Sequence, residues 1–217
     1  MIPLFHDFTD TTVLVFGGGR VGARKARRFA TEARVVVFSP AFADADFGGA
    51  ELVRTAPEPA DVRDAVSRAD PALVVAATDR EDVNDAAVAA AREANALVNR
   101  ADRSGARERA DSVVVPATVE DGPVTAALST GGRSPALSRH LREELEDELS
   151  GAGAMAELSA LLRAELKATD ATPEERRTAI RTFVRDPRVW KGLRAGSRKS
   201  RQEAVSVLAE HQGDSTT

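Results

Sequence analysis

The stretch Gly17-Gly18-Gly19-Arg20-Val21-Gly22 decides how this chain is interpreted. Its glycines form the pattern G-x-G-x-x-G, directly after the apolar run 12–16 and directly before a segment, 21–33, with helical spacing. The first glycine of such a pattern permits a tight turn, the second leaves room for a pyrophosphate, and the third lets the helix pack closely on the strand. The N–H groups at the helix start then face the anion. The stretch predicts a dinucleotide site, although a glycine turn needed only for its geometry would look the same.

Strand-like and helix-like segments alternate through the first hundred residues. The strands are mostly continuous apolar runs, which is typical of a parallel sheet covered on both faces. We therefore expect a Rossmann-like, doubly wound α/β domain. In its first helix we expect Val21, Ala26, Phe29 and Ala30 to share one face. The expected strands are 12–16, 35–38, 51–54, 73–78 and 96–99, and the expected helices are 21–33, 59–69 and 79–94.

The pattern changes after residue 100, where a charged loop is followed by a small α+β segment. Strands are expected at 112–116 and 124–129, and then a helix that Ser134 caps and that carries leucines at every fourth position. Two strands and one helix make a poor core of their own, which suggests dimerisation. From Gly151 onward only helices are expected, at 155–167, 173–184 and about 199–211. The predicted division is a dinucleotide-binding domain, 1–111, a dimerisation segment, 112–150, and a helical C-terminal domain, 151–217.

Composition excludes several classes of function. The 217 residues include no cysteine, so disulfides, thiol catalysis and cysteine metal sites are excluded. A net charge of −4 argues against nucleic acid as a partner, because phosphate binding usually leaves a basic footprint. The three histidines are too widely separated to suggest a metal site. The start has no basic region typical of a signal peptide, and no apolar run approaches the ~20 residues of a membrane helix. We expect a soluble, cytoplasmic protein.

The end of the second strand lacks a residue that many NAD sites have. An Asp or Glu commonly ends this strand and binds the adenosine ribose. Here the strand ends Phe38-Ser39-Pro40-Ala41, and the next carboxylate is Asp44. Ser39 could bind the ribose, whereas Arg20 lies near enough in sequence to meet a 2′-phosphate. The residues themselves therefore leave NAD and NADP both open.

Several segments in the right order carry a family resemblance. Pro3-Leu4-Phe5 and the glycine turn with its continuation Ala23-Arg24-Lys25 resemble one family's opening. Ala76-Ala77-Thr78-Asp79 with Asn84 resembles its "AATDD…N", and Asn99-Arg100-Ala101-Asp102 matches its "NVVD" at both ends. The segments 115–117 and 128–139 resemble "PA…ISSGGTSPVLAR". Over residues 1–150 the chain thus resembles the siroheme-synthase family of precorrin-2 dehydrogenases and sirohydrochlorin ferrochelatases.

The resemblance implies an NAD-dependent oxidation of precorrin-2 to sirohydrochlorin, followed in some members by insertion of Fe²⁺. It also implies a homodimer with its active site between the cofactor domain and the dimerisation region, here without the fused methyltransferase domain of some members. Asp102 matches the catalytic aspartate, a proposed general base, and it follows a strand at the sheet edge where such folds bind ligands. The residues expected at the cofactor are Gly17, Gly18, Gly19, Arg20, Val21, Gly22, Ser39, Pro40, Thr78, Asp79 and Asn99, and those expected at the substrate are Thr130, Gly131, Gly132, Arg133 and Ser134.

Alternatives remain at several of these positions. Asp102 would also fit a capping or solvated loop residue, and the arginines of the loop 103–111 would fit either substrate carboxylates or solvent. The 131–135 stretch would look the same as a plain helix cap and as a carboxylate cradle. As a whole, the chain could instead be a redox-sensing NAD-binding module without catalysis, or a chelatase that does not oxidise its substrate.

Overall fold

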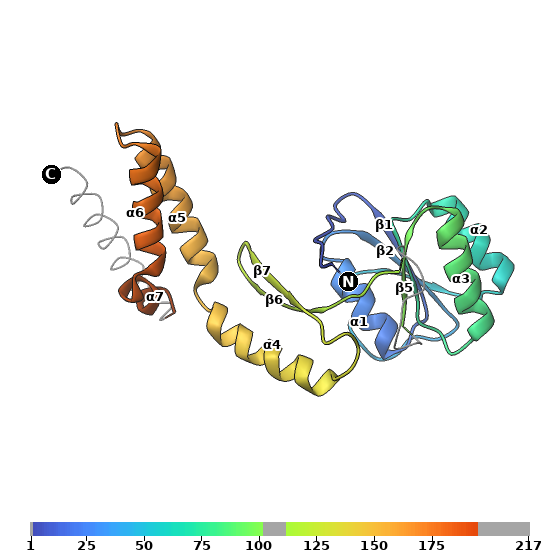
Figure 1. Cartoon of the computed structure of the whole chain (residues 1–217). Helices are drawn as coiled ribbons and strands as arrows, with labels where there is room; N and C mark the ends of the chain where they lie inside the picture. Colours follow the sequence, from blue (N-terminus) through green and yellow to red (C-terminus); the bar gives the residue numbers. More distant parts are fainter. Residues whose placement is uncertain (1, 102–111, 195–217) are drawn as a thin grey trace. The chain divides into compact units, whose positions relative to one another are not determined.

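The computed structural model in Figure 1 describes residues 2–101 and 112–194. The chain forms two compact units, Met1–Val115 and Pro116–Thr217. Residues 112–115 therefore group with the first unit, although we placed them in the dimerisation segment. The functional division into 1–111, 112–150 and 151–217 stays a prediction.

A five-stranded sheet forms the centre of the first unit. Its strand order is β3-β2-β1-β4-β5, and every neighbouring pair is parallel. The order reverses at β1, which pairs with β2 on one side and with β4 on the other. The predicted Rossmann-like, doubly wound sheet is confirmed. The strands are β1 Thr12–Phe16, β2 Arg34–Ser39, β3 Glu51–Arg54, β4 Leu73–Ala76 and β5 Leu97–Arg100.

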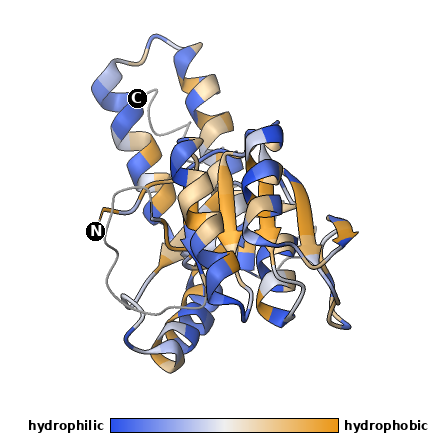
Figure 2. Cartoon of the chain, turned by 90° about the vertical axis from the view of Figure 1, so that its right-hand side faces the viewer, coloured by the Kyte–Doolittle hydropathy of each residue, from blue (hydrophilic) through white to orange (hydrophobic). Residues whose placement is uncertain are grey.

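Both faces of this sheet are buried along β1, β2 and β4, because alternate residues of these strands enter different hydrophobic clusters. Leu14 and Phe16 pack with the helices α2, Pro59–Ala69, and α3, Glu81–Glu93. Val13 and Val15 pack with α1, Arg20–Phe29. Burial on two sides explains the continuous apolar runs in the sequence, and Figure 2 shows these strands as strongly hydrophobic segments.

The first helix differs from the expectation in two ways. It ends at Phe29 and not near residue 33, and Val21 is 40% exposed. The helix buries Gly22, Ala23, Ala26 and Phe29, which share one face because Ala26 comes four residues after Gly22 and three after Ala23, and Phe29 comes three after Ala26. Val21 precedes this face by one position, so our expectation that it shares a face with Ala26 and Phe29 was wrong.

The second unit begins with an antiparallel hairpin of β6, Ala117–Asp121, and β7, Val124–Leu128. Our prediction of a strand at 112–116 was wrong, since only an isolated bridge joins Ser112 to Val98. The two-residue turn at Gly122-Pro123 pairs Asp121 with Val124, so the partner of β7 must lie at 117–121. Pro116 also lacks the N–H that a ladder needs.

The helices of the second unit follow the predicted pattern. α4, Pro135–Leu149, begins where Ser134 accepts a hydrogen bond from the N–H of Leu137, as expected of its cap. α5, Ala152–Lys167, and α6, Pro173–Arg185, are also as predicted, whereas α7, Pro187–Arg194, was not foreseen. The expected helix at 199–211 lies outside the described residues.

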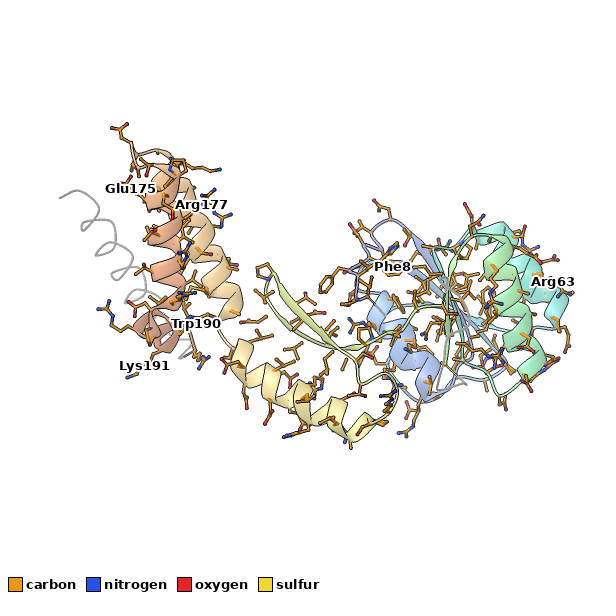
Figure 3. All side chains as sticks on the ribbon, in the orientation of Figure 1. Phe8, Arg63, Glu175, Arg177, Trp190 and Lys191 are labelled. Atoms are coloured by element: carbon orange, nitrogen blue, oxygen red, sulfur yellow. The ribbon has the colours of Figure 1, made fainter. Side chains whose placement is uncertain are left out.

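These last helices share a core of their own around Phe183, Leu162 and Met155. Trp190, labelled in Figure 3, packs against it and donates its indole N–H to the carbonyl of Val184 at 2.7 Å. Met155 and Trp190 thus both serve this helical core. Among the helices of residues 2–101 and 112–194, none has both the length and the apolar character needed to cross a membrane.

Candidate dinucleotide-binding site

The glycine turn lies at the carboxyl end of β1, where the strand order reverses. Gly17 donates its N–H to the carbonyl of Phe38 on β2 at 3.0 Å, and Ala77 donates to the carbonyl of Phe16 at 2.8 Å. The turn is thus held between the ends of β2 and β4. Open α/β sheets bind ligands in the crevice at this point of their topology.

Three of the glycines are required by contacts within the protein. A Cβ on Gly17 would lie 2.2 Å from the carbonyl oxygen of Ala77, and the residue has a φ of +121° that side chains disfavour. A Cβ on Gly18 would lie 2.3 Å from the carbonyl oxygen of Ala41. On Gly22 it would lie 1.9 Å from that of Gly17, which is the close helix–strand approach that the motif predicts.

Gly19 is different, because the protein itself gives no reason for a glycine there. Its backbone is extended (φ −73°, ψ 179°), and no heavy atom of the described residues lies within 4 Å of the Cβ it lacks. It is also the N-cap of α1, which starts with neither a side-chain cap nor an acidic residue in its first turn. The first N–H groups of a helix need partners, and an anion can supply them. The open space and the uncapped helix start fit a dinucleotide's pyrophosphate.

Arg20 and Val21 follow at the start of α1, and both are exposed. The structure thus brings the six predicted residues of the turn together in one segment beside the end of β2.

The loop after β4 borders the turn and is held by a buried amide. Asn84 is 1% exposed, and its Oδ1 accepts hydrogen bonds from the backbone N–H of Thr78 at 3.1 Å and from its hydroxyl at 2.8 Å. Its Nδ2 donates to the carbonyl of Thr78 at 2.9 Å. Asp79, also predicted at the cofactor, is exposed on this loop. Asn84 therefore positions Thr78 next to the strand end that supports Gly17.

Arg80 fixes the other side of the same loop. Its guanidinium forms two hydrogen bonds with Glu58, at 2.8 and 2.9 Å, and another with Asp82 at 2.6 Å. These bonds lower the pKa of Glu58 and of Asp82 below their usual values. Glu58 is the N-cap of α2, so Arg80 joins the starts of α2 and α3 at the edge of the site. Sequence reasoning missed Arg80, because nothing local indicates its pairing with a residue 22 positions away.

The end of β2 has the residues that the sequence indicated and no carboxylate. Ser39 is 6% exposed, and its hydroxyl donates to the carbonyl of Ala41 at 2.7 Å. Because its proton is used there, Ser39 can only accept a hydrogen bond from a ribose. Pro40 is exposed, and its carbonyl accepts a hydrogen bond from Arg54 of β3 at 3.2 Å. Arg54 is a second residue that the sequence analysis did not single out.

Asn99 lies on β5 with an unused buried acceptor. Its Nδ2 donates to the carbonyl of Val113 at 2.8 Å, whereas its Oδ1 has no partner among the described residues. Buried polar atoms are nearly always hydrogen-bonded, so this oxygen calls for a donor from elsewhere. Asp102 lies outside the described residues, and its role as a base stays a prediction.

The predicted substrate-binding loop belongs to the second unit. Gly131 and Gly132 have left-handed backbones, with φ of +64° and +77°. The hydroxyls of Thr130 and Ser138 are 2.9 Å apart, and Arg133 is exposed. The Ser134 hydroxyl is used as a cap, and the N–H groups of Gly131 and Arg133 donate to the Ser129 hydroxyl and the Thr130 carbonyl. The binding capacity of this loop therefore rests on the N–H of Gly132 and the guanidinium of Arg133. Its contact with a substrate stays a prediction.

Comparisons with known proteins place the chain in a family. A family model described as putative NAD(P)-binding matches residues 4–117, and one described as sirohaem biosynthesis protein central matches 121–148. A precorrin-2 dehydrogenase of Methanosarcina barkeri is 30% identical, with 97% of this chain and 94% of that protein covered. Siroheme synthase 1 of Aeromonas salmonicida is 34% identical, but the chain spans only 45% of its length.

A solved structure supports the same fold. The structure of SirC, precorrin-2 dehydrogenase, matches with a TM-score of 0.62 at 18% identity, covering 97% of this chain and all of that one. The chain therefore belongs to the family of precorrin-2 dehydrogenases and siroheme synthases, as its motifs predicted.

Proposed function

We propose that this protein oxidises precorrin-2 to sirohydrochlorin with NAD as the hydride acceptor. The observation that carries the proposal is the similarity to a precorrin-2 dehydrogenase over nearly the whole length of both chains. The open space at Gly19 and the uncapped start of α1 support the cofactor part independently of that name.

The reaction removes a hydride and a proton from the tetrapyrrole. Bound NAD supplies the nicotinamide that accepts the hydride. The chain's own residues hold the cofactor and receive the proton: the turn at 17–22 binds the pyrophosphate, and Asn84 and Arg80 keep the neighbouring loop in place. Asp102, which comes shortly after the end of β5 in the sequence, supplies the carboxylate that acts as the base. The orphaned Oδ1 of Asn99 accepts a hydrogen bond from the cofactor or the substrate at this edge.

We further propose that the second unit contributes the substrate loop and the dimer contact. The N–H of Gly132 and the Arg133 guanidinium bind carboxylates of the tetrapyrrole, whereas the N–H groups of Gly131 and Arg133 are hydrogen-bonded within the loop. α4 buries none of its residues, and Leu137 is 46% exposed, so this helix has an apolar surface for a second copy to cover. Insertion of Fe²⁺ as a second substrate is a prediction that rests on the family alone, and a cytoplasmic location stays a prediction from the sequence.

The proposal is tested by incubating the protein with enzymatically made precorrin-2 and NAD without oxygen, while absorbance follows NADH and sirohydrochlorin. We expect both products to accumulate. Asp102→Ala should lower kcat by about 100-fold or more, the usual contribution of a general base. Asp64→Ala removes an exposed carboxylate of α2 and should change nothing.

Two outcomes would contradict the proposal. Folded protein that binds NAD but leaves precorrin-2 unchanged would indicate the redox-sensing module instead. Metal insertion into sirohydrochlorin without any NAD-dependent oxidation would indicate a chelatase. Full turnover by Asp102→Ala would remove only the assignment of the base.

A further inference from the structure

The adenosine-ribose end of the site lacks the group that normally selects NAD. An acid at the end of β2 accepts hydrogen bonds from the ribose 2′-hydroxyl and repels a 2′-phosphate. In this chain that position is Ser39, whose hydroxyl proton is already bonded to the carbonyl of Ala41. The first carboxylate that follows in sequence, Asp44, is exposed in the next loop. Ser39 itself therefore offers no negative charge against a phosphate.

A cation lies beside this position. In the pairing of β2 with β3, Arg54 is the direct partner of Ser39. Its Nη1 donates to the carbonyl of Pro40 at 3.2 Å, and its guanidinium carbon lies 5.4 Å from the ring centre of Phe42. These two contacts fix the side chain over the segment that follows β2.

The same segment touches the phosphate-binding turn. A Cβ on Gly18 would lie 2.8 Å from both a ring carbon of Phe42 and the Cβ of Ser39. One set of packed residues thus connects the guanidinium of Arg54 to the turn that binds the pyrophosphate. The ribose of a dinucleotide on this turn would lie at the end of β2, close to Arg54.

The charge of Arg54 is also uncompensated. No carboxylate of the described residues forms an ion pair with it, and its contact with Pro40 uses one of the five N–H donors of a guanidinium. Arg34, at the opposite end of the same strand pair, is paired with Glu51 at 2.7 Å. A planar guanidinium with spare donors suits a phosphate group.

We propose that Arg54 makes the ribose end of this site accept a 2′-phosphate, so that NADP can take the place of NAD. The proposal rests on the proposed dinucleotide function and deepens it, because Arg54 is then the residue that determines cofactor specificity. Arg20, exposed at the start of α1, adds a second positive charge beside the turn.

The test measures binding to the purified full chain without precorrin-2, by calorimetric titration with NAD, NADP, 5′-AMP and 2′,5′-ADP. The wild type should bind NADP at least as tightly as NAD. Arg54→Gln should weaken NADP and 2′,5′-ADP by about tenfold or more, as expected for loss of a hydrogen bond to a charged group, and leave NAD and 5′-AMP unchanged. Arg34→Gln removes the same charge from the other end of these strands and should leave all four affinities unchanged. Added salt should weaken NADP more than NAD.

Two results would overturn the proposal. One is a wild type that discriminates strongly against NADP. The other is an Arg54→Gln variant that loses NAD and NADP equally, because Arg54 would then only hold Phe42 in place or stack on adenine. Neither result would affect the oxidation of precorrin-2 with NAD. A wild type that binds none of the four ligands would instead contradict the dinucleotide site itself, and the proposed function with it.

Discussion

Gly19→Ala adds one methyl group at the point where we expect the pyrophosphate. In the free protein that methyl has no neighbour within 4 Å, and the extended backbone of Gly19 suits alanine. Alanine restricts the unfolded chain, which stabilises the protein by up to ~1 kcal/mol, but it is a poorer N-cap than glycine by a similar amount, so stability should change by no more than about 1 kcal/mol. Binding should suffer, because the methyl displaces the phosphates from the helix N–H groups. Each lost hydrogen bond to a charged group is worth about 1.5–3 kcal/mol, which corresponds to a Kd for NAD roughly tenfold to hundredfold weaker.

Gly22→Ala is the matched comparison, because it adds the same methyl three residues later. There the Cβ would lie 1.9 Å from the carbonyl oxygen of Gly17, so the helix must move away from the strand. Such overpacking costs about 1–3 kcal/mol, and the melting temperature should fall by several degrees. Calorimetric titration and thermal unfolding of both variants separate the two effects. Tight NAD binding by a folded Gly19→Ala variant would refute the placement of the pyrophosphate at this turn.

Three further predictions concern the supports of the site and the second unit. Asn84→Ala leaves the N–H of Thr78 without its partner, so it should lower the free energy of unfolding by about 1–3 kcal/mol and weaken NAD binding. Thermal unfolding and calorimetric titration measure the two effects. Unchanged stability and affinity would show that Asn84 does not position this loop. Arg80→Gln should raise the pKa of Glu58 toward its ordinary 4.5, measured by NMR titration. Because that pKa is lowered in the folded state, the stabilisation is present above pH 4.5 and lost as the pH falls through the folded value, so wild type and variant should converge in acid. Leu137→Glu should turn the expected dimer into a monomer in sedimentation, whereas Leu161→Glu, at an exposed position of α5, should leave it a dimer. Equal masses for the two variants would contradict a dimer contact through α4.

The sequence was most informative where structure depends on local rules. The buried strands β1, β2 and β4 were predicted because both of their faces are covered, which leaves continuous apolar runs between turn residues. The glycine turn was predicted because the whole pattern lies within six residues, directly between an apolar run and a helical segment. The start of α2 followed from Pro59, and that of α4 from Ser134.

Features that depend on register and on distant pairs were missed. We predicted the strand at 112–116 because that segment has the stronger apolar run. The structure has it at 117–121, because its position is set by pairing with β7 across the turn at Gly122-Pro123. Arg80 and Arg54 were not singled out, since their partners lie on other elements. Asn84 was noted as part of a motif, but its burial and its three bonds to Thr78 came only from the folded loop.

The most direct measurement of the central claim is a single turnover, with the protein in excess over precorrin-2 and with NAD present in the absence of oxygen. One NADH should form for each sirohydrochlorin, at the same rate, and neither should form when NAD is omitted. Sirohydrochlorin formed without NADH, or precorrin-2 left intact by protein that demonstrably binds NAD, would contradict the proposed oxidation.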